Sequence, residues 1–376
     1  MTDFRASAIT RDYGERPTRY ARKAGAGRYV RAMIPGPYLL YLGHCADAMS
    51  IKTSRGLATF RPELCVGEFR HDDCPLTLGL PRLGMTAGVE AGARTLILGI
   101  AGAGGRLGND LVEDAAIALK AGMNVAAGLH QRLRDVPGLS ALAAERGLQL
   151  FDVREPPADL EVGTGYERAG HRLLTVGTDC SVGKMYASLA LVSALRERGI
   201  EADFRATGQT GILIAGEGVP VDAVVADFIS GAIERLAPAR HDHGWDVIEG
   251  QGSLFHPSFA GVSMGLLHGA QPEAIVLCHR PGRTHMRGLP GRALPDLGLC
   301  LERNLEAARL TSPRVRAVGI CLNTSGMEPA EARRLCDSTA DRIGLPCTDP
   351  IAFGAHSIVD ELLCLASSKP STIASR

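Results

Sequence analysis

Residues 176–190, VGTDCSVGKMYASLA, predict a phosphate-binding turn between a strand and a helix. The apolar run HRLLTV, residues 171–176, supplies the strand, and the segment after Lys184 supplies a long helix. Glycines let the backbone approach a ligand, and the amino end of a helix attracts anions. The alternative is a glycine-rich turn with a surface lysine. The order of strand, loop and helix favours a phosphate site made of Gly177, Thr178, Asp179, Cys180, Ser181, Val182, Gly183, Lys184 and Met185.

Met185 stands where the common phosphate loop has a serine or a threonine. That hydroxyl normally contacts Mg²⁺, whereas a thioether is a poor ligand for a hard cation that prefers oxygen. The loop therefore keeps its anion site and loses a usual magnesium contact, and we expect no metal there. It favours a ligand whose pyrophosphate is bound but not cleaved, and coenzyme A is the obvious member of that class.

The composition indicates a globular protein of ordinary type. The chain has 376 residues, enough for two domains, and its 41 basic residues balance 41 acidic ones, so charge gives no case for binding nucleic acid. No apolar run approaches the roughly 18 residues of a membrane span, and the first residues lack the apolar core of a signal peptide. Ten scattered cysteines form no Cys-x-x-Cys pair, and we interpret them as reduced. We expect a cytoplasmic protein that contacts no membrane.

The first half of the chain predicts a βαβ unit. Apolar runs at residues 94–105 and 121–130 are strand-like, and residues 106–120 between them have helical spacing. The glycines of GIAGAGG, residues 99–105, fit the dinucleotide fingerprint poorly, so an ordinary tight turn is the better interpretation. Upstream, residues 38–70 suggest a strand, a loop and a second strand.

A linker is expected over residues 151–170, where paired prolines, charges and glycines cluster. After it, short apolar strands alternate with helices, one of them predicted over residues 221–236 with Val225, Phe228, Ile229, Ala232 and Leu236 on one face. The sequence thus predicts an α/β protein: an N-terminal Rossmann-like βαβ domain, residues 1–160, and a P-loop NTPase-like domain, residues 161–376. The second has a mostly parallel sheet flanked by helices, with its site at the carboxyl ends of the strands.

Two resemblances follow from these motifs. GTDCSVGK, residues 177–184, resembles the loop of dethiobiotin synthetase and its relatives, which use ATP and magnesium, and DVIEGQGSL resembles their segment after the Walker B strand. Together with residues 206–234, HGAQPEAIVLCHRPGR and GMNVAAGLH, these motifs resemble a P-loop family long described as a domain of unknown function. Members of that family have been assigned as D-glutamate N-acetyltransferases. The resemblance implies acetyl transfer from acetyl-CoA to the amino group of D-glutamate, in D-amino-acid catabolism.

Such a reaction needs a base for the amine and donors for an oxyanion. Glu249 ends a strand beside the loop and His256 follows it, so either is a candidate base, although a structural hydrogen bond explains each equally well. Asp179 is a candidate for orienting the substrate or the loop. Cys180 lies just before a helix and beside a lysine, which are reasons for a lowered thiol pKa and would allow a covalent acetyl intermediate. A packed, inert thiol is the better interpretation, since no paired histidine is identifiable from the sequence.

Glutamate carries two carboxylates, which call for arginine or backbone amides. Basic and amide side chains follow two predicted strands, and the alternative for each is a solvated loop: Arg205, Gln209, Arg280, Arg283, His285 and Arg287. Asn323, at the end of a late strand, resembles the asparagine that reads adenine in the dethiobiotin synthetase fold.

Two other functions stay open. One is an ATP- and magnesium-dependent ligase or kinase resembling dethiobiotin synthetase, in which Ser181 or Glu249 supplies the missing magnesium ligand. The other is a nucleotide-binding regulator without catalysis. A homodimer is expected only because twofold assemblies are common.

Overall fold

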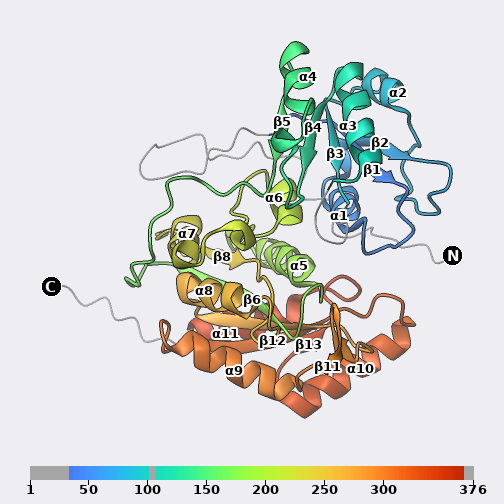
Figure 1. Ribbon diagram of the computed structural model, residues 1–376. Coiled ribbons are helices and arrows are strands. Elements are labelled where there is room, and N and C mark those ends of the chain that lie inside the picture. The colour runs from blue at the N-terminus through green and yellow to red at the C-terminus, as the bar shows by residue number, and fades with distance from the viewer. Residues whose placement is uncertain (1–33, 101–106, 368–376) are drawn as a thin grey trace. The chain divides into compact units, whose positions relative to one another are not determined.

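A computed structural model describes residues 34–100 and 107–367, which form two compact units (Figure 1). The first unit extends to Pro157 and takes in Gly208–Ala223; the second holds Ala158–Thr207 and the chain from Val224. The GIAGAGG turn lies largely outside the described residues, as does the amino-terminal segment.

The first unit is built on a five-stranded sheet, and every pairing in it is parallel. The strand order is β2-β1-β3-β4-β5, which agrees with the Rossmann-like prediction. Its strands are β1 (Tyr38–Gly43), β2 (Cys65–Arg70), β3 (Thr95–Leu98), β4 (Asn124–Ala127) and β5 (Leu150–Asp152). Its α-helices are α1 (Lys52–Phe60), α2 (Met85–Glu90), α3 (Asn109–Ala121), α4 (Leu139–Glu145) and α6 (Gln209–Ala215).

The predicted βαβ unit is present as β3, α3 and β4. Leu111, Ala115 and Ala118 on α3 are buried against the sheet, which explains the helical spacing read from the sequence. The segment expected to be a loop between β1 and β2 was predicted wrongly, because it contains α1. That helix buries Thr53, Ser54 and Gly56 beside Leu57 and Phe60. Because several residues on its buried face are small or polar, the helix lacks the regular spacing of apolar residues from which helices were predicted.

The second unit is built on a six-stranded parallel sheet in the order β13-β12-β9-β6-β8-β7. A short antiparallel pair, β10 and β11, follows β9 in sequence. The strands are β6 (His171–Gly177), β7 (Ala202–Arg205), β8 (Trp245–Ile248), β9 (Ala274–His279), β10 (His285–Met286), β11 (Leu289–Ala293), β12 (Arg316–Leu322) and β13 (Cys347–Thr348). The α-helices are α5 (Lys184–Glu197), α7 (Ile229–Leu236), α8 (Ala260–Ala270), α9 (Leu297–Arg309), α10 (Pro329–Ile343) and α11 (His356–Ser367).

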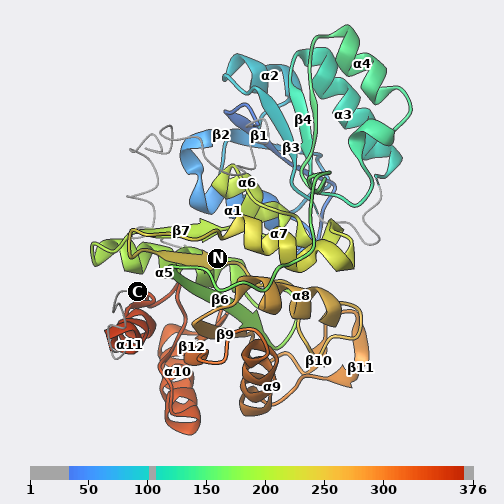
Figure 2. The same cartoon turned by 90° about the vertical axis from the view of Figure 1, so that its left-hand side faces the viewer.

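Helices cover this sheet on both faces, as the sequence predicts. Helices α5 and α11 pack against each other and on the central strands (Figures 1 and 2). Helix α8 contacts β6, α9 contacts β12, and α7 packs on α8. The central strands are buried on both sides, so they appear in the sequence as continuous apolar runs rather than alternating ones. Among the described helices, none combines the length and the apolarity needed to cross a membrane.

The helix predicted over residues 221–236 is only half present. Helix α7 begins at Ile229, and short 3-10 turns cover Val221–Ala223 and Ala226–Phe228 instead. Ile229, Ala232 and Leu236 are buried as expected, whereas Val225 is 66% exposed. The apolar spacing therefore begins before the true start of the helix at Ile229. The first residues of the predicted helix, up to Ala223, belong to the first unit.

Candidate active site

The loop between β6 and α5 has the backbone of an anion site. Ser181 has φ of 53° and Gly183 has φ of 102°, so the chain passes twice through the left-handed region. Alternation of this kind turns successive N–H groups toward one side and forms an anion-binding nest. Among the described residues, no backbone carbonyl accepts from the N–H groups of Asp179, Ser181, Val182 or Gly183. These groups are therefore available to an anionic ligand.

Gly177 is required where the strand enters the loop. A Cβ placed there would lie 2.9 Å from Cγ2 of Val182 and 3.0 Å from Nζ of Lys184, so these side chains would have to shift. The close approach lets the lysine fold back beneath the loop.

Lys184 is the first residue of α5, and its side chain is only 7% exposed. Its Nζ donates to the carbonyl oxygens of Asp179 at 2.9 Å and Gly252 at 2.8 Å. Burial lowers the pKa of this amine from its usual value, while neighbouring groups that include Asp179 and Glu249 oppose that shift. An ammonium has three N–H donors. Within the described residues two are used, so one is left for a ligand.

Two arginines from the segment after β9 donate hydrogen bonds to the loop. Arg283 donates to Oδ2 of Asp179 at 2.8 Å, to the carbonyl of Cys180 at 2.7 Å and to that of Ser181 at 3.1 Å. The backbone N–H of Arg287 also donates to Oδ2 of Asp179, and its guanidinium donates to the Ser181 hydroxyl. These contacts stabilise the left-handed backbone of Ser181, which is unfavourable for a residue other than glycine.

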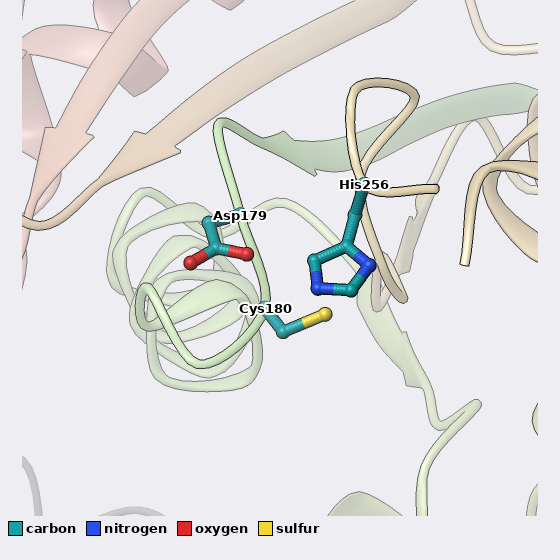
Figure 3. Close-up of side chains that lie close together, drawn as sticks. All are labelled: Asp179, Cys180 and His256. Atoms are coloured by element: carbon teal, nitrogen blue, oxygen red, sulfur yellow. The ribbon is translucent and has the colours of Figure 1, made fainter. Parts of the chain in front are cut away.

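The loop also brings Asp179 and Cys180 together with His256, which follows β8. One oxygen of Asp179, Sγ of Cys180 and one ring nitrogen of His256 all lie within 4.8 Å of one another. Figure 3 shows the sulfur beside the imidazole, with the carboxylate to their left. Asp179 is fully buried and His256 is 3% exposed, whereas Cys180 is partly exposed. The sequence could not show this pairing, because nothing in the spacing relates His256 to Cys180.

Glu249 is held by structural contacts at the end of β8. Its Oε2 accepts from the backbone N–H of Thr207 at 3.0 Å, and its Oε1 accepts from Nε2 of Gln251 at 3.1 Å. The side chain is 5% exposed. These contacts match the structural alternative, so the catalytic role of Glu249 stays a prediction.

His279 and Asn323 stand beside the loop at the ends of β9 and β12. The Thr178 hydroxyl shares a hydrogen bond of 3.0 Å with Nδ1 of His279. Burial, aided by Arg283 and Arg342, lowers the pKa of His279 to about 4, so the ring is neutral at pH 7. The side chain of Asn323 would be 3.6 Å from a Cβ at Gly183, so it lies directly beside the loop.

The other predicted substrate residues are dispersed. Arg205 bonds to Asp246 at 2.9 Å and also pairs with Asp203, so it belongs to an ion-pair group of β7 and β8. Gln209 is the first residue of α6, in the first unit, while His285 is exposed and bonds to Thr284. Arg280 and Arg287 lie in the segment after β9, and β9 is the neighbour of β6 in the sheet. The sequence undervalued Arg283, which it treated only as one of several basic residues.

Met185 is the second residue of α5 and is partly exposed. The hydroxyl of Ser181 is bonded by Arg287, and both oxygens of Glu249 are bonded by Thr207 and Gln251. The oxygen atoms considered as replacements for a magnesium ligand are thus engaged elsewhere. The loop itself suits the phosphates of a coenzyme, since it offers unpaired N–H groups and a buried ammonium.

The fold and the loop define an α/β protein with a Rossmann-like unit and a P-loop unit. Two family models match: DUF1611_C, described as a P-loop domain of unknown function, over residues 161–359, and DUF1611_N, a Rossmann-like domain of unknown function, over residues 70–156. The chain belongs to the DUF1611 family. A crystal structure of a DUF1611 family protein from Anabaena variabilis is similar, with a TM-score of 0.81 and 34% identity over 88% of this chain and 100% of that chain.

Two curated relatives carry the name D-glutamate N-acetyltransferase. The protein from a Pseudoalteromonas species is 48% identical over 88% of this chain and 99% of its own length. The protein from Tritonibacter scottomollicae is 46% identical, also over 88% of this chain and 99% of its own length. Similarity at this level over nearly the whole of each relative makes the present protein an enzyme, an acyltransferase.

Proposed function

We propose that the protein transfers an acetyl group from acetyl-CoA to the amino group of D-glutamate, a step in D-amino-acid catabolism. The observation that carries this proposal is a complete anion cradle, residues 177–184, followed by Met185 in place of the magnesium-binding hydroxyl. A site of this kind binds phosphates without cleaving them. The names of the two curated relatives support the acetyl group and the amino acid.

The coenzyme phosphates would lie on the loop. The backbone N–H groups of the nest and the third N–H of Lys184 supply the donors, and the positive end of α5 adds to them. Asn323 would contact the base, as the resemblance to dethiobiotin synthetase suggests. No magnesium ion takes part in this scheme.

The amine of the second substrate attacks only when it is unprotonated. His256 lies within 4.8 Å of Asp179 and Cys180 of the loop, whereas both oxygens of Glu249 accept structural hydrogen bonds, which favours His256 over Glu249 as the base. Arg280, His285 and Arg287 follow β9 and are the remaining candidates for the two carboxylates of glutamate. Gln209 and Arg205 stay predictions for the same role.

A panel assay tests the proposal. The purified protein is incubated with acetyl-CoA and with the D and L forms of several amino acids, and free thiol release is followed by a colorimetric reagent. We expect release with D-glutamate and an acetylated product by mass spectrometry. Thiol release with none of the amino acids would refute the proposal.

A further inference from the structure

A cavity lies beyond the carboxyl end of β2 in the first unit, and the proposed function does not use it. Its volume is about 350 Å³, which is within the range of sites for small ligands. In parallel sheets with the strand order of this unit, ligands bind beyond the carboxyl ends of the strands. The side chains that line the cavity come from one segment of the chain: Phe69, Arg70, His71, Asp72, Arg82 and Leu83.

His71 is held in the wall of this cavity by a buried carboxylate. Its Nε2 is 2.8 Å from Oδ2 of Asp114, and the same oxygen accepts the hydroxyl hydrogen of Tyr41 at 2.6 Å. Burial raises the pKa of Tyr41, and the hydrogen bond to Asp114 adds to that shift, so the hydroxyl stays protonated and donates. Because a carboxylate only accepts, Nε2 carries the hydrogen of the neutral His71 ring and Nδ1 is an acceptor.

Neighbouring rings fix the orientation of His71. The ring of His44 is stacked on it, with 3.9 Å between the ring centroids and 2° between the ring planes, and Phe69 meets it edge to face at 5.2 Å. Nδ1 of His44 is in turn 2.7 Å from Oδ1 of Asp73. Among the described residues no group bonds to Nδ1 of His71, and this atom is not buried. An oriented acceptor is therefore open to a ligand.

Two arginines keep spare donors at the same cavity. Nε of Arg70 donates to the buried Glu68 at 3.1 Å, and its Nη1 donates to the Cys74 carbonyl at 3.3 Å. Nε and Nη2 of Arg82 donate to the Arg70 carbonyl at 3.2 and 2.9 Å, and Nη2 also donates to Asp72 at 2.6 Å. In the part of the chain that the structure describes, Nη2 of Arg70 and Nη1 of Arg82 make no hydrogen bond. Guanidinium groups fixed in this way bind carboxylates.

The charges around the cavity are balanced, and this balance indicates the kind of ligand. Each of the two guanidinium groups is paired with a carboxylate, that of Glu68 or that of Asp72. A ligand with a net charge would leave one side uncompensated, whereas a zwitterion brings both charges. Its carboxylate suits the spare N–H groups of the arginines. Its ammonium suits Nδ1 of His71 and the exposed carboxylate of Asp72.

We propose that this cavity binds a small, free α-amino acid. The spare N–H groups of Arg70 and Arg82 bind its carboxylate, and Nδ1 of His71 accepts from its ammonium. Phe69 and Leu83 contact its side chain. The site is built from the first unit alone and does not rest on the proposed function, because it recognises the two charges that all α-amino acids share.

Calorimetric titration of the whole chain tests the proposal. The ligands are alanine and glutamate, each in its D and L form. Their matched probes lack one charge: propionate and ethylamine for alanine, glutarate and γ-aminobutyrate for glutamate. We expect at least one amino acid to bind, and its matched probes to bind at least about 10-fold more weakly, because each loses a charge-assisted contact. Binding of none of the four amino acids, or equal affinity for an amino acid and its probes, would overturn the proposal.

Variants show whether the ligand is in this cavity. Arg82→Met removes one donor at an exposed position, and His71→Phe keeps an aromatic ring and removes Nδ1. Each should weaken binding about 10-fold or more. The matched control is Arg146→Met, because Arg146 is exposed and precedes the strand at the opposite edge of the same sheet. Normal thermal unfolding of Arg82→Met excludes misfolding as the cause. Wild-type affinity in both Arg82→Met and His71→Phe would overturn the proposal.

Lys184→Ala separates this site from the phosphate loop. The variant should bind the amino acid with wild-type affinity, and loss of that binding would overturn the proposal. Acetylation of D-glutamate by a protein whose amino-acid binding is unaffected by Arg82→Met and His71→Phe would also overturn it, and would leave the proposed function intact. Binding that depends on Arg82 and His71 in a protein that acetylates no amino acid would support the site and refute the proposed function.

Discussion

At the scale of single residues, Lys184 is the side chain on which coenzyme binding depends most directly. It is buried beneath the loop, and its ammonium is already held by two carbonyls. Lys184→Ala removes a charge-assisted contact to phosphate, worth about 1.5–3 kcal/mol, so acetyl-CoA binding should weaken roughly 10- to 100-fold. Calorimetric titration measures the change. Lys120→Ala, at an exposed position of α3, is the control, and equal affinities for both variants would contradict the phosphate site.

The lowered pKa of His279 predicts how the free energy of unfolding changes with pH. Its pKa of about 4 in the folded protein lies below the ordinary 6.5, so between these values the unfolded chain binds the extra proton. The contribution is fully present above about pH 6.5 and is lost as the pH falls toward 4. One pKa unit corresponds to about 1.4 kcal/mol, and solvent screening reduces the effect, so the contribution of His279 to the free energy of unfolding is about 1–3 kcal/mol.

Urea unfolding of the wild type and of His279→Asn between pH 7 and pH 4.5 measures this contribution. The difference between their unfolding free energies should shrink as the pH falls. A difference that stays constant over this range would show that His279 does not titrate as stated.

The sequence identified the phosphate loop because its residues are contiguous. It could not identify the pairing of Cys180 with His256, which depends on how the loops after β6 and β8 meet at one sheet edge. The structural roles of Arg205 and Glu249 were hidden for the same reason, since their partners Asp246 and Thr207 lie on other strands or loops.

At the scale of elements, the segment from β9 to β10 supports the phosphate loop through Arg283. Breaking a buried ion pair leaves an uncompensated charge, so Arg283→Met should lower the free energy of unfolding by about 3 kcal/mol. Adding Asp179→Asn should recover part of that loss, because the unpaired charge is removed. Chemical denaturation of both single variants and the double variant gives the coupling. Strictly additive effects would argue against the pair.

The matched control is Arg303→Met on α9. Arg303 bonds to Glu306 at 2.7 Å, but both side chains are 49% exposed. An exposed pair contributes little, so this change should leave the free energy of unfolding nearly unchanged.

Helix prediction succeeded where the buried face is apolar and failed where it is not. Helix α3 buries leucines and alanines at regular spacing and was predicted near its observed limits. Helix α1 buries threonine, serine and glycine, which carry no hydrophobic signal. The start of α7 was misplaced because Val225 continues the apolar spacing although it is exposed.

At the scale of the whole molecule, the fold class was predictable because strands and helices alternate along the chain. The parallel sheets of both units and the family models agree with it. The incorporation of residues 208–223 into the first unit was not predictable, since it depends on contacts between segments far apart in sequence, such as the hydrogen bond of Thr53 to Thr210.

The homodimer remains a prediction that sedimentation can check. We expect a species with twice the mass of the chain at micromolar concentration. A single species with the mass of one chain, unchanged as concentration rises, would contradict it.

The central claim is that the loop holds a coenzyme whose phosphates stay intact. Its most direct test is turnover of acetyl-CoA and D-glutamate with a strong chelator present and ATP absent, followed by thiol release and product mass. The account predicts the same rate with and without the chelator, and acetylated D-glutamate as the product. A reaction that requires ATP and magnesium and releases ADP would contradict it.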